Sequence, residues 1–315
     1  MRYGLTSGIL WGLDTVILGI ALSMVPFIGT LEAVAFAAIA SSFLHDAFCA
    51  LWLFAYMAMR GRLGDTLAAL KTRSGKVVIL GALLGGPIGM TGYVVAINNI
   101  GAAYTAIISA FYPAFGAFMA FVLLKERMDA KHITALVVAL LGVMAMGWMS
   151  ADGEASGNAV LGLVGAAACV VGWGSEAVLC GWGMRDDAVD NETALQIRET
   201  TSALVYAVVV LPAFGAWAFT AQAIPSFATC VVGLAGLAGA VSYLFYYKAI
   251  STIGAARGMA LNISYSVWAV LLGVVLLGAI PSVPEIVCCL VILGGTILAA
   301  ADWGELFGRK GTHAS

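Results

Sequence analysis

The hexapeptide Asn98-Asn99-Ile100-Gly101-Ala102-Ala103 separates two long apolar runs, and a related hexapeptide, Ser251-Thr252-Ile253-Gly254-Ala255-Ala256, returns 153 residues later. The same shift relates Tyr93-x-x-Ala96-Ile97 to Tyr246-x-x-Ala249-Ile250. Self-similarity at a fixed spacing is the signature of a repeat architecture. The sequence therefore predicts two copies of one unit, residues 1–150 and 157–304, followed by a short tail at 305–315.

Charged and aromatic positions follow the same repeat. His45-Asp46 aligns with Arg198-Glu199 at the shift of 153 residues. Near the start of each copy, Trp11-Gly12-x-Asp14 aligns with Trp173-Gly174-x-Glu176 at a shift of 162 residues, which indicates a longer connector between the copies. Chance matches are common in so apolar a sequence, but several matches in one order, with charges among them, favour a true repeat.

The composition places the chain in a membrane. It is 62% hydrophobic and only 10% charged, with a mean hydropathy of +1.00, whereas a soluble domain carries about 25% charged residues. The net charge of −2 argues against a nucleic-acid partner. The six cysteines lie in apolar runs, so they predict no disulfide framework. The first apolar run is long and contains Asp14, so it is not read as a signal peptide.

A spanning helix needs about 20 apolar residues. Ten stretches of suitable length and composition predict an all-α polytopic membrane protein with five spans in each repeat: 4–24, 32–58, 76–97, 102–124, 132–149, 158–182, 195–218, 227–249, 255–278 and 284–303.

Lys and Arg predict the orientation of these spans, because they concentrate in cytoplasmic loops. All fifteen are assigned to one side, including Arg198 at the edge of the seventh span, so both termini are expected in the cytoplasm. An odd number of spans in each repeat forces the two copies into opposite orientations. The prediction is therefore an inverted pair of five-helix repeats.

The sequence carries no signature of an enzyme. It lacks a phosphate-binding loop and a nucleophile elbow, and its three histidines are too scattered for a metal cluster (residues 45, 132 and 313), so no cofactor and no metal are expected. Polar residues inside apolar helices are the candidates for function instead, because such groups are costly in lipid and usually face a cavity or a partner.

Asp14 and Glu176 lie at matching places in the first and sixth spans, with Trp11 and Trp173 three residues before them. Residues three apart share one face of a helix, so each repeat offers an aromatic wall beside an acid. Three interpretations stay open: a carboxylate that couples transport to protons, a contact for a substrate amino group, or a hydrogen-bonding group in helix packing.

His45 and Asp46 match Arg198 and Glu199 in the second and seventh spans. The unperturbed pKa of a histidine near 6.5 suits proton coupling or sensing. The alternative is a local ion pair that holds the two repeats together.

Aromatic and amide side chains cluster in the third, fourth, eighth and ninth spans, and the candidates for the wall of a cavity are Tyr93, Asn98, Tyr112, Tyr246, Asn262, Tyr265 and Trp268. The alternative for the aromatic rings is the interfacial belt of a membrane protein. Pro113 directly follows Tyr112 and predicts a kink in the fourth span.

These features resemble a known family. Trp11-Gly12, Thr105-Ala-Ile-Ile-Ser-Ala-Phe-Tyr-Pro113 and Leu123-Leu124-Lys125-Glu126-Arg127 are similar to EamA-type repeats of the drug/metabolite transporter superfamily. The second copy departs from the pattern, with Ser266 in place of the proline and Ala279 in place of the acid. Within the superfamily the chain looks most like YddG-like amino-acid exporters.

The resemblance implies a monomeric ten-helix carrier with a central cavity in the bacterial inner membrane, in contact with lipid and with a small-molecule substrate. Such a carrier would export amino acids, aromatic ones included, or related metabolites by alternating access. One alternative is a carrier of sugar-nucleotides or other phosphorylated metabolites, which would need cations in the cavity. The only candidates are Arg198, Lys248 and Arg257, all expected near the cytoplasmic edge. A membrane scaffold without transport activity is the alternative from another class.

Overall fold

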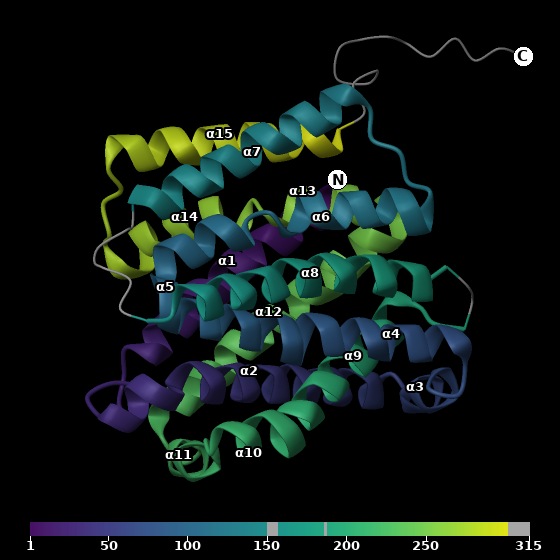
Figure 1. Cartoon of the computed structure of the whole chain (residues 1–315). Coiled ribbons are helices and arrows are strands. Elements are labelled where there is room, and N and C mark those ends of the chain that lie inside the picture. The colour runs from purple at the N-terminus through teal and green to yellow at the C-terminus, as the bar shows by residue number, and fades with distance from the viewer. Residues whose placement is uncertain (150–156, 186–187, 302–315) are drawn as a thin grey trace, which may run out of the picture.

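The computed structural model describes residues 1–149, 157–185 and 188–301, and these residues form helices joined by short connectors (Figure 1). In chain order the helices are α1 (Arg2–Leu22), α2 (Leu31–Met59), α3 (Leu63–Ala69), α4 (Arg73–Leu83), η1 (Leu84–Met90), α5 (Thr91–Ser109), α6 (Tyr112–Met119), η2 (Ala120–Leu124), α7 (Ala130–Met149), α8 (Ala159–Gly183), α9 (Asn191–Val205), η3 (Tyr206–Val210), α10 (Leu211–Phe214), α11 (Trp217–Ala223), α12 (Phe227–Ile253), α13 (Ala255–Asn262), α14 (Tyr265–Leu277) and α15 (Val283–Ala300).

Ten continuous stretches of these helices are long and apolar enough to cross a membrane, as predicted. They are Arg2–Leu22, Leu31–Met59, Arg73–Ala102, Tyr104–Leu124, Ala130–Met149, Ala159–Gly183, Asn191–Phe214, Phe227–Ile253, Ala255–Leu277 and Val283–Ala300. The all-α class and the two sets of five spans are confirmed. The exact boundaries of the repeats remain a prediction, and residue 150, the tail at 305–315 and the end of the last predicted span lie outside the described residues.

Short polar side chains fix the starts of many helices. The N-cap side chain accepts a hydrogen bond from the backbone N–H three residues ahead at Thr30, Thr72, Asn158, Asp190, Ser226 and Ser282. Each such bond satisfies one of the backbone donors that a helix leaves unpaired at its start. The long apolar runs between these caps have no other way to satisfy their backbone in lipid than to form helices.

The two glycines of the repeated hexapeptides mark the joints between spans. Gly101 has φ 83° between the third and fourth spans, and Gly254 has φ 92° between the eighth and ninth. This left-handed region is strained for residues with a Cβ atom but open to glycine. The chain can therefore turn from one span directly into the next at these two points.

The fourth and ninth spans are each interrupted near their middle. The fourth breaks between Ser109 and Tyr112, just before Pro113, and the ninth breaks between Asn262 and Tyr265. The ninth break forms without a proline, because Ser264 and Ser266 instead bond to carbonyls of the preceding turn.

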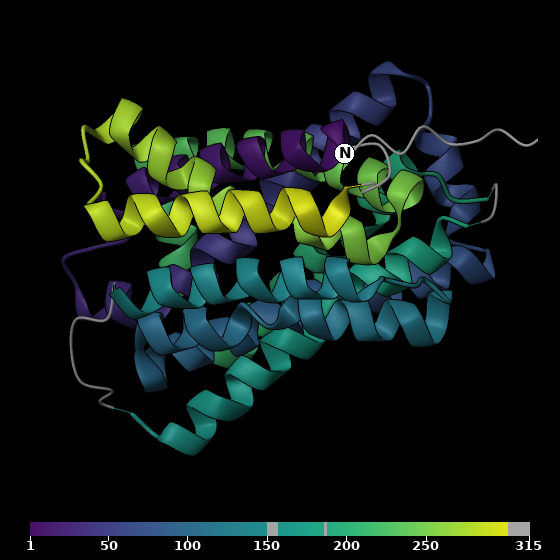
Figure 2. The ribbon, with the colours of Figure 1, turned by 90° about the horizontal axis from the view of Figure 1, so that it is seen from above.

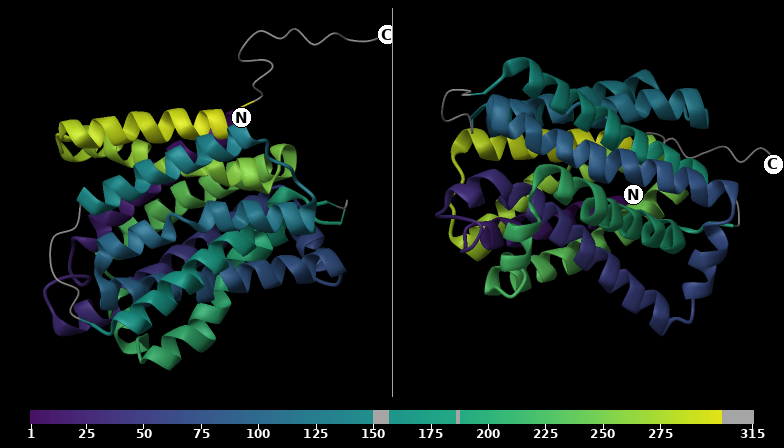
Figure 3. Two further views of the ribbon diagram at one scale, coloured as in Figure 1. Left: turned by 45° about the horizontal axis from the view of Figure 1, so that its top comes forward. Right: turned by 60° about the horizontal axis from the view of Figure 1, so that its bottom comes forward.

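The two repeats interleave rather than stand side by side. α1 of the first repeat packs along α12 and α14 of the second, and α8 of the second repeat packs along α4, α5 and α6 of the first (Figures 1 and 2). The start of α1 and the end of α15 lie at the same end of the bundle (Figure 3). Any cavity in the centre is consequently walled by both repeats.

One end of the bundle is closed by apolar side chains. Leu53, Val78, Leu124, Cys180 and Ile250 come from five spans and are 4% exposed or less. We call these five residues the closed-end cluster. They lie near the ends of their spans that adjoin α3 and the start of α9, and α11 lies at the other end of the bundle (Figure 1). The central cavity therefore meets packed apolar side chains at this end.

Candidate functional site

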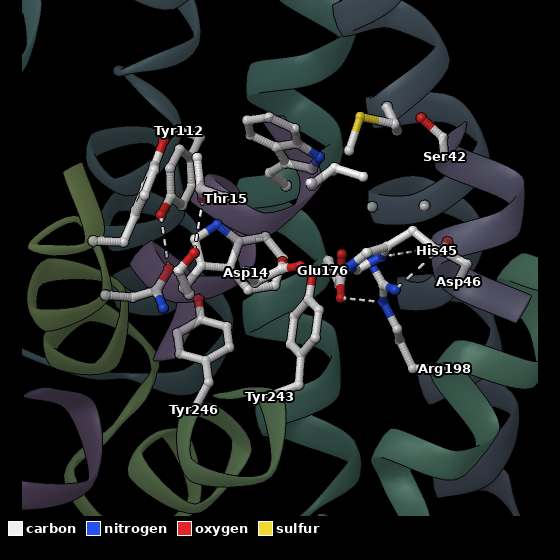
Figure 4. Close-up of a pocket in the computed structure, with 18 of the residues that line it drawn as sticks. Asp14, Thr15, Ser42, His45, Asp46, Tyr112, Glu176, Arg198, Tyr243 and Tyr246 are labelled. Atoms are coloured by element: carbon white, nitrogen blue, oxygen red, sulfur yellow. Dashed lines mark hydrogen bonds and ion pairs between the residues drawn. The ribbon is translucent and has the colours of Figure 1, made fainter. Parts of the chain in front are cut away.

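A cavity of about 350 Å³ lies in the middle of the bundle (Figure 4). It extends along α1 from Trp11 to Leu22, toward the connector at residues 23–30 and away from the closed-end cluster. Thr15 and Gly19, which line this part of its wall, are exposed. Its volume lies within the range of about 300–1,000 Å³ that is usual for small-molecule sites.

Two acid–base pairs from repeat-related positions face each other across the centre. The Asp14 carboxylate on α1 lies 3.0 Å from Nε2 of His45 on α2, and Nε of Arg198 on α9 donates to the Glu176 carboxylate on α8 at 2.9 Å. The four side chains are between 3% and 7% exposed. The repeat thus builds one pair in each half, with histidine as the base in the first half and arginine in the second.

Arg198 is the hub of the charged network. Besides Glu176, its guanidinium donates to Glu199 at 2.8 Å and to the Tyr243 hydroxyl at 3.2 Å, and it lies 3.7 Å from Asp46. Every nitrogen of the guanidinium therefore has a protein partner. A buried arginine is tolerated because these fixed partners compensate for the hydration it has lost.

Asp46 connects the two pairs. One of its oxygens lies 3.5 Å from Nδ1 of His45, and the other accepts a hydrogen bond from the Ser202 hydroxyl. His45 is therefore held between Asp14 and Asp46 and can bond to a carboxylate through both ring nitrogens, which is the arrangement that a protonated imidazole satisfies best.

Acids outnumber bases in this network. Asp14, Asp46, Glu176 and Glu199 face Arg198 and His45, so even with a protonated histidine the ionised network carries a surplus of two negative charges. A buried, unbalanced charge of this size is costly in a low-dielectric interior. Bound protons or a bound cation would remove the imbalance.

Aromatic rings form the remaining walls. Trp11 contacts Tyr243 edge-on with ring centroids 4.7 Å apart, and Trp173 lies 5.7 Å from Tyr112 at 90°. Tyr246 and Tyr265 also line the cavity. The faces of such rings carry partial negative charge, so they attract cations.

The part of the cavity formed by α6 and α13 is polar but uncharged. Asn262 accepts a long hydrogen bond of 3.5 Å from the Tyr112 hydroxyl and donates to Ser7 at 2.9 Å. Glycines on η1 make room near the charged side, since a methyl group at Gly85 would overlap the Glu176 carboxylate.

Most of the predicted site residues meet at this cavity. Nine of the twelve line it: Trp11, Asp14, His45, Tyr112, Trp173, Glu176, Tyr246, Asn262 and Tyr265. Tyr93 lies behind the wall with its ring 5.3 Å from that of Trp173. Asn98 is exposed at the joint before Gly101, and Trp268 packs against Gly12 of α1 outside the lining.

Arg198 does not lie where the sequence predicts. It was expected at the cytoplasmic edge with the other cations, but it lies in the centre of the bundle and lines the cavity. Asp46, Tyr243, Thr15 and Ser42 also line the cavity without having been named as site residues. The alignment of His45-Asp46 with Arg198-Glu199 was the available signal, because a repeat that places His45 in the centre also places Arg198 there.

Comparison with known proteins identifies the family. The model of the EamA-like transporter family matches residues 2–148 and again residues 160–301. Protein LicB of Haemophilus influenzae is 31% identical over 197 residues, which are 62% of this chain and 65% of LicB, so the match spans less than two thirds of that protein. A crystal structure of a protein with 20% sequence identity has the same fold, with a TM-score of 0.69 over 98% of both chains. With both five-helix repeats matched, the chain belongs to the EamA-like transporter family of the drug/metabolite transporter superfamily, and it is a multi-pass membrane protein.

Proposed function

We propose that this transporter is a secondary carrier for small solutes that bear an ammonium group beside an apolar or aromatic remainder, with amino acids as the first class to test. The observation that carries the proposal is the surplus of buried carboxylates over bases in an aromatic-lined cavity. An ammonium group would balance part of the surplus charge and would also be attracted by the ring faces.

Asp14 is the carboxylate best placed to receive the ammonium group. It lines the cavity and has a histidine as its only basic partner within the described residues, whereas Glu176 is bound by Arg198 and by the Tyr247 hydroxyl. Deprotonation of His45 would leave the charge of Asp14 unpaired and available to a cation. Asp14 and His45 are accordingly our candidates for coupling transport to protons, whereas Glu176, the third candidate from the sequence, is held by Arg198.

The alternative of a phosphorylated substrate finds less support. Phosphate is usually bound by arginine forks or free lysines. Arg198 is the one arginine among the lining residues, and its guanidinium nitrogens already bond to Glu176, Glu199 and Tyr243. An anion in this cavity would face more carboxylates than cations.

We propose transport by alternating access, because inverted repeats allow the two ends to exchange their conformations. The cavity extends toward one end of the bundle, and the closed-end cluster fills the other. If the two repeats exchange their conformations, the open and closed ends exchange as well. We place the termini in the cytoplasm of a bacterium because the loops at the closed end carry the lysines and arginines. In this orientation the cavity faces outward, and we propose export as the direction of net transport.

A counterflow assay with the purified protein in proteoliposomes tests the proposal. Vesicles are loaded with unlabelled phenylalanine, and uptake of labelled phenylalanine is challenged with phenethylamine, which lacks the carboxylate, and with 3-phenylpropionate, which lacks the ammonium group. A trimethylated phenethylamine adds a cation that cannot donate hydrogen bonds.

We expect the compounds with an ammonium group to compete and 3-phenylpropionate to have no effect. Counterflow of labelled phenethylamine in vesicles that show no counterflow of phenylalanine would replace amino acids with organic cations as the substrate class. Competition by 3-phenylpropionate alone would refute recognition of the ammonium group.

A further inference from the structure

The carboxylate of Glu126 bonds to the start of another span. Glu126 follows the fourth span, and its two oxygens accept hydrogen bonds from the backbone N–H groups of Ala255, at 3.0 Å, and Ala256, at 3.1 Å. These are the first two residues of α13, where the ninth span begins. A carboxylate at a helix start is stabilised by the unpaired backbone donors and by the helix dipole.

Gly254 is fitted to this contact. Its φ of 92° turns the chain into α13, and a Cβ atom there would lie within 2.8–3.0 Å of the Glu126 carboxylate. The repeated hexapeptide therefore supplies both the joint and the space for the acid. None of the cavity residues is involved, so the proposed binding site does not account for the contact.

The contact lies at the closed end of the bundle. Leu124 of the closed-end cluster lies two residues before Glu126, and Ile250 lies near the end of the eighth span, five residues before Ala255. The backbone carbonyl of Leu124 also accepts a hydrogen bond from Arg185, at the end of the sixth span, at 2.7 Å. If this end opens by separation of the fourth span from the ninth, the bonds of Glu126 must break.

The repeat-related position at the other end of the bundle is not an acid. The shift of 153 residues aligns Glu126 with Ala279, which follows the ninth span, and an alanine side chain cannot accept a hydrogen bond. A Cβ atom built on Gly101, the counterpart of Gly254, would meet nothing within 4 Å. The two ends of the carrier are therefore held differently.

We propose that Glu126 is a latch that favours the conformation with this end closed, and that its replacement by Ala279 in the second repeat leaves the other end free to open. The inference rests on the proposed alternation between two conformations, each open at a different end of the bundle. It does not depend on which solute is carried. A side-chain cap stabilises a helix start by a free energy that corresponds to a fewfold to thirtyfold change in an equilibrium constant. The latch is weak enough to open during each transport cycle.

The test measures accessibility at both ends in the full-length protein in lipid nanodiscs, without substrate. The closed-end reporter is native Cys180, which is fully buried one turn beyond Glu176, with the other five cysteines replaced by alanine. The open-end reporter is a cysteine in place of exposed Thr15 in a cysteine-free background. The rate of reaction with a hydrophilic maleimide is then compared with and without Glu126→Gln.

We expect Glu126→Gln to raise the rate at Cys180 about tenfold and to lower the rate at position 15. Ala279→Glu, which adds the missing acid at the opposite end, should lower the rate at position 15. The matched control is Glu285→Gln, which removes the capping-box acid of α15 and should change neither rate.

Unchanged rates in Glu126→Gln would overturn the latch and make Glu126 a static cap. Faster reaction at both positions would also overturn it, because general loosening is not a shift between two conformations. An unchanged rate in Ala279→Glu would refute the proposed asymmetry. Since no transport is measured, these outcomes are independent of the counterflow assay, whose failure alone would overturn only the proposed substrate.

Discussion

Replacement of Asp14 by asparagine separates the three interpretations of this buried acid. Asparagine keeps the size of the side chain and an acceptor for Nε2 of His45, which lies 3.0 Å from the carboxylate. Only the charge is removed. Since Asp14 is 3% exposed, water cannot replace the lost interaction with a cation.

The expected loss follows from the strength of one buried, charge-assisted contact. A hydrogen bond to a charged group contributes about 1.5–3 kcal/mol. A free energy of about 1.4 kcal/mol corresponds to a factor of ten in affinity. Asp14→Asn should therefore weaken binding of an ammonium-bearing solute about tenfold to a hundredfold if the acid contacts the substrate.

Counterflow and proton-driven flux measured in the same vesicles distinguish the roles. Loss of both activities indicates substrate binding, whereas loss of driven flux with intact counterflow indicates coupling to protons. The matched control is Glu32→Gln, which removes an exposed acid at the start of α2 and should leave both activities intact. Wild-type activity of Asp14→Asn in both assays would refute a role in transport and leave Asp14 as a hydrogen-bonding group in helix packing.

Three further predictions concern the network, the wall and the orientation. Arg198→Gln leaves the buried carboxylates of Glu176 and Glu199 without their base, so we expect a loss of about 3 kcal/mol in stability, visible as a lower melting temperature in detergent; an unchanged melting temperature would contradict the role of Arg198 as the hub of the network. Tyr112→Ala should weaken substrate binding, because Tyr112 lines the cavity. Trp268→Ala lies outside the lining and should lower only the melting temperature. Equal effects of the two variants on binding would contradict this assignment of the cavity wall. In cysteine-free protein, Ile280→Cys should react with an impermeant reagent in intact cells and Lys71→Cys only after lysis, and the reverse result would invert the proposed orientation.

The spans could be predicted because they depend on composition along the chain and not on contacts between distant residues. A run of about 20 apolar residues crosses the membrane as a helix whatever its neighbours are, so all ten runs were found within a few residues. The break before Pro113 follows from one residue type for the same reason. The break at Asn262 was not expected, because it depends on serine side chains that bond to the backbone, and serine is common within regular helices.

The site could be predicted only in part because it depends on how each helix is rotated about its axis. Asp14, His45 and Glu176 stand out in the sequence because an ionisable group in lipid is costly wherever it points. Tyr93 and Trp268 have plausible depths, but an aromatic ring is stable on any face of a helix, so depth alone does not place it in the cavity. Asn98 lies at the exposed joint before Gly101, where an amide can remain hydrated. Arg198 was assigned to the loops because the rule for positive charges treats a cation near the predicted end of a span as an edge residue.

The two repeats share positions in the fold but differ in the residues at those positions. Two of these differences make the halves of the carrier unequal. The first repeat has histidine at position 45, where the second has Arg198, and it has Glu126, where the second has Ala279. Histidine can exchange a proton near neutral pH, but arginine stays charged. We infer that proton exchange is confined to the pair of Asp14 and His45, while Glu176 and Arg198 act as a fixed electrostatic brace. A carrier with identical halves would gain no preference between its two end conformations, and these two substitutions give this chain such a preference.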